Sequence, residues 1–103
     1  MIPMTESSVP VQHDLAQQKF FLTLQGHEAQ LRYRTQGRML DVFSTFVPES
    51  LRGRGLAEQL CKAAFEYAKA QQCTVIPSCP YISGAYLKRH PEYLSLTRTT
   101  HDT

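Results

Sequence analysis

A glycine-rich basic turn is the segment of this sequence whose residue types are best suited to chemistry. Residues 52–57 read Arg-Gly-Arg-Gly-Leu-Ala, between an apolar run that ends at Val47 and an amphipathic run that begins at Leu56. Glycines let the backbone come close to a ligand, and the first turn of a helix offers unpaired N–H groups at the positive end of the helix dipole. The small side chain of Ala57 keeps the approach open. The pattern therefore favours a site for an anion, above all a phosphate.

The residues of the turn alone leave other interpretations open. Gly-Arg-Gly is also ordinary composition for a flexible basic loop on a protein surface. Other phosphate loops fit less well, because the Gly-Lys-Ser/Thr of a Walker A loop is missing and a dinucleotide fingerprint would need a third glycine where Glu58 stands.

Cys79 is the second residue that could do chemistry. It follows the short β-branched run at residues 74–76 and stands just before Pro80, where we expect a helix to start whose dipole would favour a thiolate. The alternative is a small buried residue, the common fate of a free cysteine, and it fits Cys61 on the apolar stripe of the preceding helix. No packing period explains Cys79, so we interpret it as a candidate reactive thiol.

Three strands must position the turn from its N-terminal side. Apolar residues alternate over residues 19–25 and again over residues 28–35, where one face should be buried and the other wet. Gly26 and Gly37 supply the turns between strands. Residues 38–47 carry apolar side chains at both parities, which predicts a central strand covered on both faces.

A helix, a strand and a second helix follow the turn. One helical stripe in residues 56–71 is made of Ala57, Leu60, Cys61, Ala64 and Ala68. Residues 74–76 predict a strand that Pro77 ends, and a helix between two strands predicts a crossover to a parallel neighbour. Residues 81–89 predict a short last helix, which Pro91 ends.

The predicted order is β-β-β-α-β-α in one α/β (α+β) domain with a mixed, mostly antiparallel sheet. We expect this domain to cover residues 13–96, with flexible tails at residues 1–12, which are rich in Ser, Pro and Thr, and at residues 97–103, which are polar.

The turn and its context resemble the GNAT superfamily of N-acetyltransferases. Arg52, Gly55 and Ala57 match the superfamily signature Arg/Gln-x-x-Gly-x-Gly/Ala, and the order of elements around them matches its acetyl-coenzyme A core. The resemblance covers residues 13–96. It is closer still to very short GNAT-like proteins of about 100 residues. Their shared pattern is matched by residues 47–57, by Pro77-Ser-Cys-Pro-Tyr81 and by His90-Pro-Glu-Tyr93.

The resemblance implies acetyl-coenzyme A (acetyl-CoA) as cosubstrate, with no metal. The pyrophosphate would lie on the turn, and the pantetheine arm would insert between two parallel strands that splay apart, here residues 38–47 and 74–76. Pro77 has no N–H to continue strand pairing, which would leave backbone groups free for the pantetheine. The residues expected to bind the cosubstrate are Phe46, Val47, Arg52, Gly53, Arg54, Gly55, Leu56 and Ala57.

The resemblance also implies catalytic candidates. In the short family the cysteine matching Cys79 is the proposed catalytic residue, either as a nucleophile or as a group that assists direct attack by an amine. Many GNAT enzymes protonate the departing thiolate with a tyrosine of the last helix, for which Tyr86 is the first candidate and Tyr81 the second. Simple packing on the sheet is the alternative for both tyrosines. The glutamate base common on the long strand is missing, because the only acid there is Asp41.

Composition limits the function classes. A net charge of +2 does not indicate a nucleic-acid partner, although five arginines lie between Arg32 and Arg54. Three cysteines at unrelated spacings favour neither a disulfide framework nor a metal site, and they fit a reducing compartment. No apolar stretch approaches the roughly 20 residues that span a bilayer. We therefore expect a cytoplasmic protein without a membrane partner, either a monomer or a weak dimer.

Three functions are compatible with these features. The first is an acetyl-CoA-dependent N-acetyltransferase with an unidentified amine acceptor, for which a protein or peptide would suit a groove left open in so short a chain. The second is a non-catalytic acyl-CoA-binding module that uses the same turn without needing Cys79. The third is an interaction protein whose arginines contact RNA or acidic partners.

Overall fold

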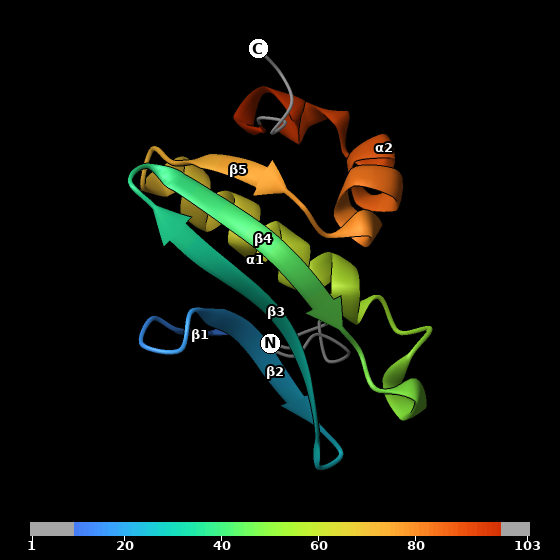
Figure 1. The fold of residues 1–103 in the computed structure, drawn as a ribbon. Helices are drawn as coiled ribbons and strands as arrows, with labels where there is room; N and C mark the ends of the chain where they lie inside the picture. Colours follow the sequence, from blue (N-terminus) through green and yellow to red (C-terminus); the bar gives the residue numbers. More distant parts are fainter. Residues whose placement is uncertain (1–9, 98–103) are drawn as a thin grey trace, which may run out of the picture.

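Alternation of apolar and polar residues builds a five-stranded sheet whose strands lie side by side in chain order. The computed structural model describes residues 10–97 of the chain. The first four strands are antiparallel neighbours, and the fifth pairs parallel to the fourth (Figure 1). The strands are β1 (Gln12–Asp14), β2 (Lys19–Leu24), β3 (His27–Gln36), β4 (Met39–Phe46) and β5 (Thr74–Pro77).

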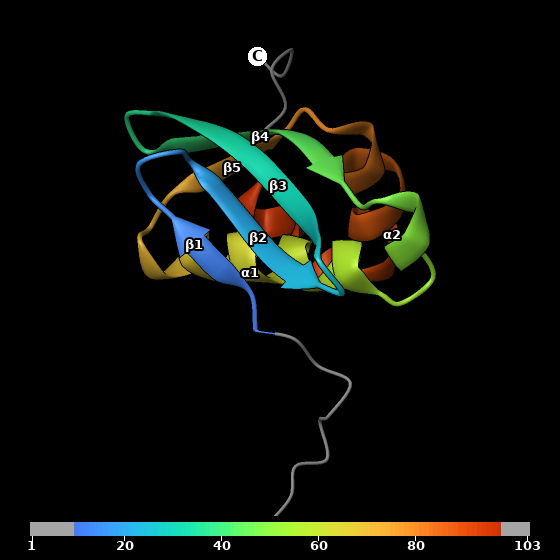
Figure 2. The ribbon, with the colours of Figure 1, turned by 90° about the horizontal axis from the view of Figure 1, so that it is seen from below.

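The helix α1 (Leu56–Ala70) covers one face of this sheet (Figure 2). Its buried side consists of Leu56, Leu60, Cys61, Ala64, Phe65 and Ala68. These side chains share one core with the buried residues of β2, β3 and β4. Because α1 connects β4 to β5, the predicted crossover to a parallel neighbour is confirmed.

Short helical pieces complete the same side of the molecule. A 3₁₀ helix, Glu49–Leu51, precedes the glycine-rich turn. After β5 the chain forms a π-helical turn, Ile82–Tyr86, then α2 (Leu87–Arg89) and a 3₁₀ helix, Pro91–Leu96. Among residues 10–97, no helix is long and apolar enough to cross a membrane, and no cluster of His, Cys, Asp and Glu side chains is suited to hold a metal ion.

Three elements were not predicted: the 3₁₀ helix Glu49–Leu51, the strand β1 and the 3₁₀ helix Pro91–Leu96. The strand β1 begins at Gln12, inside the expected tail, and its three residues are too few to show an alternating pattern. The 3₁₀ helix Pro91–Leu96 continues beyond the proline that was expected to end the last helix, and it is held by tertiary packing of Tyr93 on Phe65. From β2 onward the order of the strands, of α1 and of the helical segment after β5 is the predicted one. The tail predictions for residues 1–9 and 98–103 lie outside the described residues.

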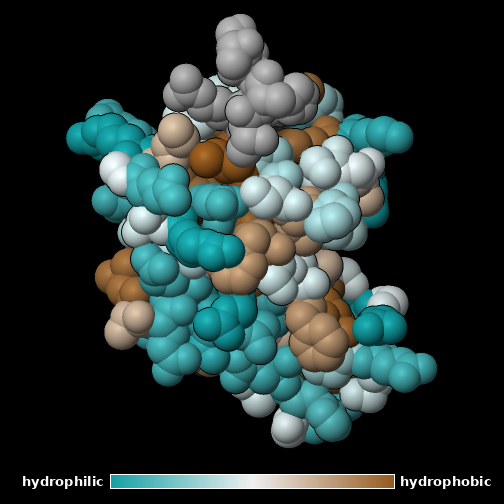
Figure 3. All heavy atoms as spheres, in the orientation of Figure 1, coloured by the Kyte–Doolittle hydropathy of each residue, from teal (hydrophilic) through white to brown (hydrophobic). Residues whose placement is uncertain are grey.

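The prediction that β4 is covered on both faces was wrong. None of the described helices lies on the face opposite α1, and hydrophilic side chains spread over much of it (Figures 2 and 3). Apolar residues occur at both odd and even positions of β4 for a different reason. A β-bulge at Phe43 shifts the pairing register between Arg32 and Tyr33 of β3. Beyond the bulge, Thr45 pairs with buried Leu31, so the inward parity changes within the strand.

Candidate functional site

The glycine-rich turn enters α1 through two glycines in left-handed backbone conformations. Gly53 has φ 83°, and Gly55, the residue that precedes the first turn of α1, has φ 74°. L side chains rarely adopt these values, which explains the glycines. Apart from the glycine itself and its two chain neighbours, no atom of the described residues lies within 4 Å of the place that a Cβ would take at either position. The turn is therefore open on its outer side, where the amides of the first helical turn have no intrahelical acceptor.

The two arginines of the turn differ in their surroundings. Arg52 donates from Nε to the carbonyl of Val47 at 3.0 Å, so its guanidinium braces the turn against the end of β4. The exposed Arg54 makes no hydrogen bond or ion pair with any residue in 10–97. A cavity of about 400 Å³, here called the turn pocket, is lined by Val47, Leu51, Arg52, Gly53, Gly55, Leu56, Ala57, Glu58, Tyr81 and Arg89.

Pairing between the parallel strands β4 and β5 ends at Pro77, one residue beyond the predicted end of the strand. The last paired positions are Val42 on β4 and Pro77 on β5, and the next contact is the Cys79 amide, which donates to the Val42 carbonyl at 2.9 Å. Residues 43–46 of β4 have no β5 partner on that edge. The unpaired edge leads to Val47, which lines the turn pocket. The unpaired stretch of β4 beyond Val42 is here called the split between β4 and β5. Phe46 is 50% exposed and is the cross-strand partner of Gln30 on β3, so only its backbone lies at the split.

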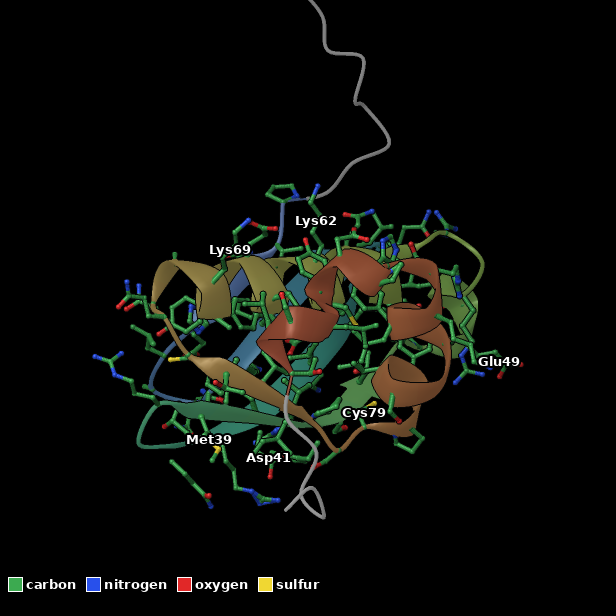
Figure 4. All side chains as sticks on the ribbon, turned by 90° about the horizontal axis from the view of Figure 1, so that it is seen from above. Met39, Asp41, Glu49, Lys62, Lys69 and Cys79 are labelled. Atoms are coloured by element: carbon green, nitrogen blue, oxygen red, sulfur yellow. The ribbon has the colours of Figure 1, made fainter. Side chains whose placement is uncertain are left out.

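Cys79 lies just past the end of strand pairing, between β4 and the last helical segment (Figure 4). Its carbonyl accepts the amides of Ile82 and Ser83, so the residue stands at the start of that segment, as predicted. Cys79 is 4% exposed, and its Sγ lies 3.4 Å from the hydroxyl oxygen of Thr45. Cys79 is not part of the lining of the turn pocket.

The two other cysteines of the chain match the structural alternative. Cys61 is fully buried on α1, and this burial, with the nearby groups of Cys79 and Glu58, raises the pKa of its thiol well above the usual range. Such a thiol stays protonated and unreactive at neutral pH. Cys73 is half-buried, and its Sγ lies 3.8 Å from the Gln71 carbonyl near the start of β5.

The two candidate tyrosines occupy different places. Tyr81 lines the turn pocket, and burial, followed by the nearby Cys61 and Glu58, raises the pKa of its hydroxyl, which is therefore protonated at neutral pH. Tyr86 is 1% exposed and stacks on Phe65 with ring centroids 5.7 Å apart. The structure does not bring Tyr86 to the turn pocket, because its ring fills the space between the last helical segment and α1.

A second cavity of about 400 Å³ adjoins the first. It is lined by Gly55, Glu58, Gln59, Lys62, Tyr86, His90, Glu92 and Tyr93. Glu58 lines both cavities, and its carboxylate accepts from Arg89 and contacts His90 Nε2 at 3.3 Å. This carboxylate ties the start of α1 to the end of α2 and is already engaged by Arg89 and His90.

Sequence reasoning missed three residues of the site. Thr45 had a weak signal, since it is a polar residue near the end of a strand with apolar neighbours. Glu58 is the third residue after the helix-capping Gly55, a position that favours an acid, but nothing in the sequence indicated its partners. Arg89 gave no signal, because its place beside the turn depends on the tertiary packing of the last helical segment.

The sequence and fold have recognisable relatives. Residues 19–96 match the family model described as GCN5-related N-acetyl-transferase. Protein NATD1 of Xenopus tropicalis is 36% identical over 88 residues, which cover 82% of this chain and 80% of that protein. Protein NATD1 of Homo sapiens is 36% identical over 86 residues, or 81% of this chain and 75% of the relative.

A solved structure has the same fold. It is the NMR structure of a GCN5-like protein from Staphylococcus aureus, with a TM-score of 0.68, 20% identity, and coverage of 92% of this chain and 97% of that one. The family model spans more than half of the chain. The chain therefore belongs to the GCN5-related N-acetyltransferase family.

Proposed function

We propose that this protein is an acetyl-CoA-dependent N-acetyltransferase. The observation that carries the proposal is the split between β4 and β5: strand pairing stops at Val42 and Pro77, and the unpaired edge of β4 leads directly to the turn pocket at Val47. An unpaired strand edge suits a ligand arm with amide groups, and an open helix start suits a diphosphate. Acetyl-CoA has both parts and would supply the acetyl group as a thioester.

The residues of the site fit such a ligand. The outer side of Gly53 and Gly55 is free of protein atoms, so phosphate oxygens can approach the amides of residues 53–57. The exposed Arg54 is available for a charge-assisted hydrogen bond, whereas Arg52 supports the turn through Val47.

Tyr81 and Cys79 are the candidates for chemistry. The protonated hydroxyl of Tyr81 lines the turn pocket, so it is the better placed of the two tyrosines to give a proton to a departing thiolate. Cys79, held by Thr45, would either accept the acetyl group on its sulfur or assist direct attack by the amine.

A non-catalytic acyl-CoA-binding module is the second candidate, and two observations favour it. The thiol of Cys79 is almost fully buried. In addition, Glu58 is the only carboxylate among the described residues that line the turn pocket, and it is engaged by Arg89 and His90. A general base free to accept a proton from the amine is not part of this lining.

Release of free CoA thiol from acetyl-CoA separates the two functions. We expect release above background with a mixture of small amines and lysine peptides, and a rate lower by about 100-fold or more in Cys79→Ala. Cys61→Ala is the matched control, because its thiol is buried and protonated, and it should keep a rate close to that of the parent protein.

Each other outcome has a defined meaning. Equal rates of thiol release in Cys79→Ala and the parent protein would mean that the amine attacks the thioester directly, without help from Cys79. If CoA raises the melting temperature but no amine supports thiol release, the protein is a binding module.

A further inference from the structure

Arg89 brings a cation to the turn pocket from outside the glycine-rich turn. It is the last residue of α2, yet it lines this pocket together with the start of α1. The charged side chains of the lining are Arg52, Glu58 and Arg89, so two positive charges stand against one negative charge. Glu92 lines the neighbouring cavity instead, where it contacts Nδ1 of His90 at 3.5 Å. The charges of the turn pocket therefore favour an anion.

The ion pair between Arg89 and Glu58 leaves most of the guanidinium free. Nη1 of Arg89 donates to Oε2 of Glu58. A guanidinium carries N–H donors on each of its nitrogens in a fixed planar fork, and the other donors of Arg89 have no partner among residues 10–97. The Arg89 side chain is also 55% exposed. It can therefore donate to the oxygen of a ligand while it keeps its contact with Glu58.

Tertiary packing holds the backbone that carries Arg89. The amide of the next residue, His90, donates to the Tyr86 carbonyl at 2.9 Å, and the ring centroids of these two residues are 4.4 Å apart. Tyr93 stacks on Phe65 of α1 at 4.8 Å between ring centroids. Arg89 thus projects from a segment that is already fastened to α1, which lowers the entropy cost of ordering it around a ligand.

The arrangement of donors suits two linked phosphates. The outer side of Gly53 and Gly55 leaves the amides at the start of α1 open to one anionic group. Arg89 adds charge-assisted donors from a second element of the same pocket. A ligand that carries anionic oxygens on two adjacent groups can be held by both elements at once.

We propose that Arg89 binds the diphosphate of acetyl-CoA from α2 and thereby makes the site select CoA thioesters over thioesters that lack the diphosphate. Glu58 holds the guanidinium at the pocket through the ion pair. The inference rests on the proposed function, because it names a further binding residue for the same cosubstrate and a basis for its selection.

A double-mutant cycle separates ligand binding by Arg89 from its ion pair with Glu58. The cycle compares the parent protein, Arg89→Gln, Glu58→Gln and the variant with both changes. If Arg89 only pairs with Glu58 or offsets its charge, Arg89→Gln has no effect on ligand affinity once Glu58→Gln is in place. If Arg89 binds the diphosphate, the effect persists there.

The ligands are CoA and pantetheine, which keeps the thiol-bearing arm of CoA but carries no phosphate. Dissociation constants are measured in a buffer without phosphate, by calorimetry for CoA and by NMR titration for pantetheine, and melting curves check the folding of each variant. Arg38→Gln is the matched control. Arg38 is also an exposed arginine with one hydrogen bond, to the Gln71 carbonyl at 3.3 Å, and it precedes the end of β4 that lies away from the turn pocket.

We expect Arg89→Gln to weaken CoA binding by at least about tenfold, both in the parent protein and together with Glu58→Gln, because charge-assisted hydrogen bonds to phosphate are lost. Glu58→Gln alone should bind CoA as tightly as the parent protein or more tightly, since it removes a negative charge beside the phosphates. Pantetheine affinity should be the same in all these proteins, and Arg38→Gln should bind CoA like the parent protein.

Equal CoA affinity in Glu58→Gln and in the variant with both changes would overturn the inference. So would an equal loss of CoA and pantetheine binding in Arg89→Gln, or an equal loss of CoA binding in Arg38→Gln. These results would leave the proposed function intact, because the parent protein would still bind CoA. Failure of the parent protein to bind CoA would overturn both the proposed function and the role of Arg89.

Discussion

Tyr81 and Tyr86 differ in what surrounds their hydroxyl groups, and this decides which of them can act on a ligand in the turn pocket. Tyr86 is clamped in a stack with Phe65 and Tyr93, and burial raises the pKa of its hydroxyl well above the usual range. Tyr81 lies on the pocket wall near Arg89. The sequence pattern could not distinguish the two tyrosines, because the position of Tyr86 depends on its stacking against Phe65, more than fifteen residues away along the chain.

Removing one hydroxyl at a time tests this difference. We expect Tyr81→Phe to lower kcat for thiol release by about 10- to 100-fold, because a proton donor is lost at the pocket. Tyr86→Phe should leave kcat nearly unchanged, since Tyr86 lines the neighbouring cavity and not the turn pocket. Steady-state kinetics and melting curves of both variants provide the measurement. A large loss of kcat in Tyr86→Phe alone would restore Tyr86 as the catalytic candidate.

For Cys79, the sequence predicted the position in the fold but not the side-chain contact. Its place at the start of the last helical segment followed from Pro80 and the strand before it, and the structure has it there. Its contact with Thr45 did not follow from the sequence, because the bulge at Phe43 brings Thr45 to the inner face of β4. A bulge adds one residue to a strand and leaves no simple mark in an alternating pattern.

At the scale of elements, the strands and the helix with a regular pattern of apolar and polar residues were predicted correctly. Strong alternation located β2 and β3, and the helical stripe located α1 to within one residue at its end. Where tertiary contacts hold an element, the pattern failed. β1 exists because His13 stacks on Phe20, at 4.0 Å between ring centroids, and three residues carry no readable period.

The glycine-rich turn allows a test of backbone conformation against ligand approach. Gly55→Ala places a Cβ at φ 74° and should cost about 1 kcal/mol of stability, because left-handed backbone is unfavourable for L residues. The new methyl group would also project into the space where we propose that the phosphates bind. We expect CoA affinity to fall by about tenfold or more, measured by calorimetry.

Gly26→Ala is the matched control for this variant. Gly26 has φ 78° in the β2–β3 hairpin, and no protein atom lies within 4 Å of the place that its Cβ would take, so the strain is comparable and the ligand site is distant. Both variants should melt about 4–8 °C lower than the parent protein. Only Gly55→Ala should bind CoA less tightly, and equal affinities in the two variants would argue against phosphate binding at the turn.

At the scale of the whole molecule, an aromatic cluster fastens the first edge of the sheet to α1. The ring centroids of His13 on β1 and Tyr67 on α1 are 4.5 Å apart, and Nε2 of His13 lies 2.5 Å from the hydroxyl oxygen of Tyr33 on β3. Burial, followed by the nearby Tyr67 and Asp14, raises the pKa of Tyr33 to about 12, so its hydroxyl stays protonated at neutral pH beside the imidazole of His13.

This cluster should make the stability of the whole fold depend on pH. Burial lowers the pKa of His13 below 6.5, and the weaker effect of Asp14 opposes it. The unfolded chain therefore binds more protons than the folded chain between the folded pKa and 6.5. The stability that His13 contributes is complete above pH 6.5 and is lost as the pH falls toward the folded pKa, because a partly buried imidazole must then carry a charge.

Two phenylalanine variants separate titration of the imidazole from loss of the hydrogen bond. At pH 8 both His13→Phe and Tyr33→Phe should lose about 1 kcal/mol, the usual net value of one hydrogen bond. On acidification to pH 5, the melting temperature of Tyr33→Phe should continue to fall, because His13 still titrates in a buried position. The advantage of the parent protein over His13→Phe should shrink in the same range. A constant difference between the parent protein and His13→Phe from pH 8 to pH 5 would mean that His13 does not couple protonation to folding.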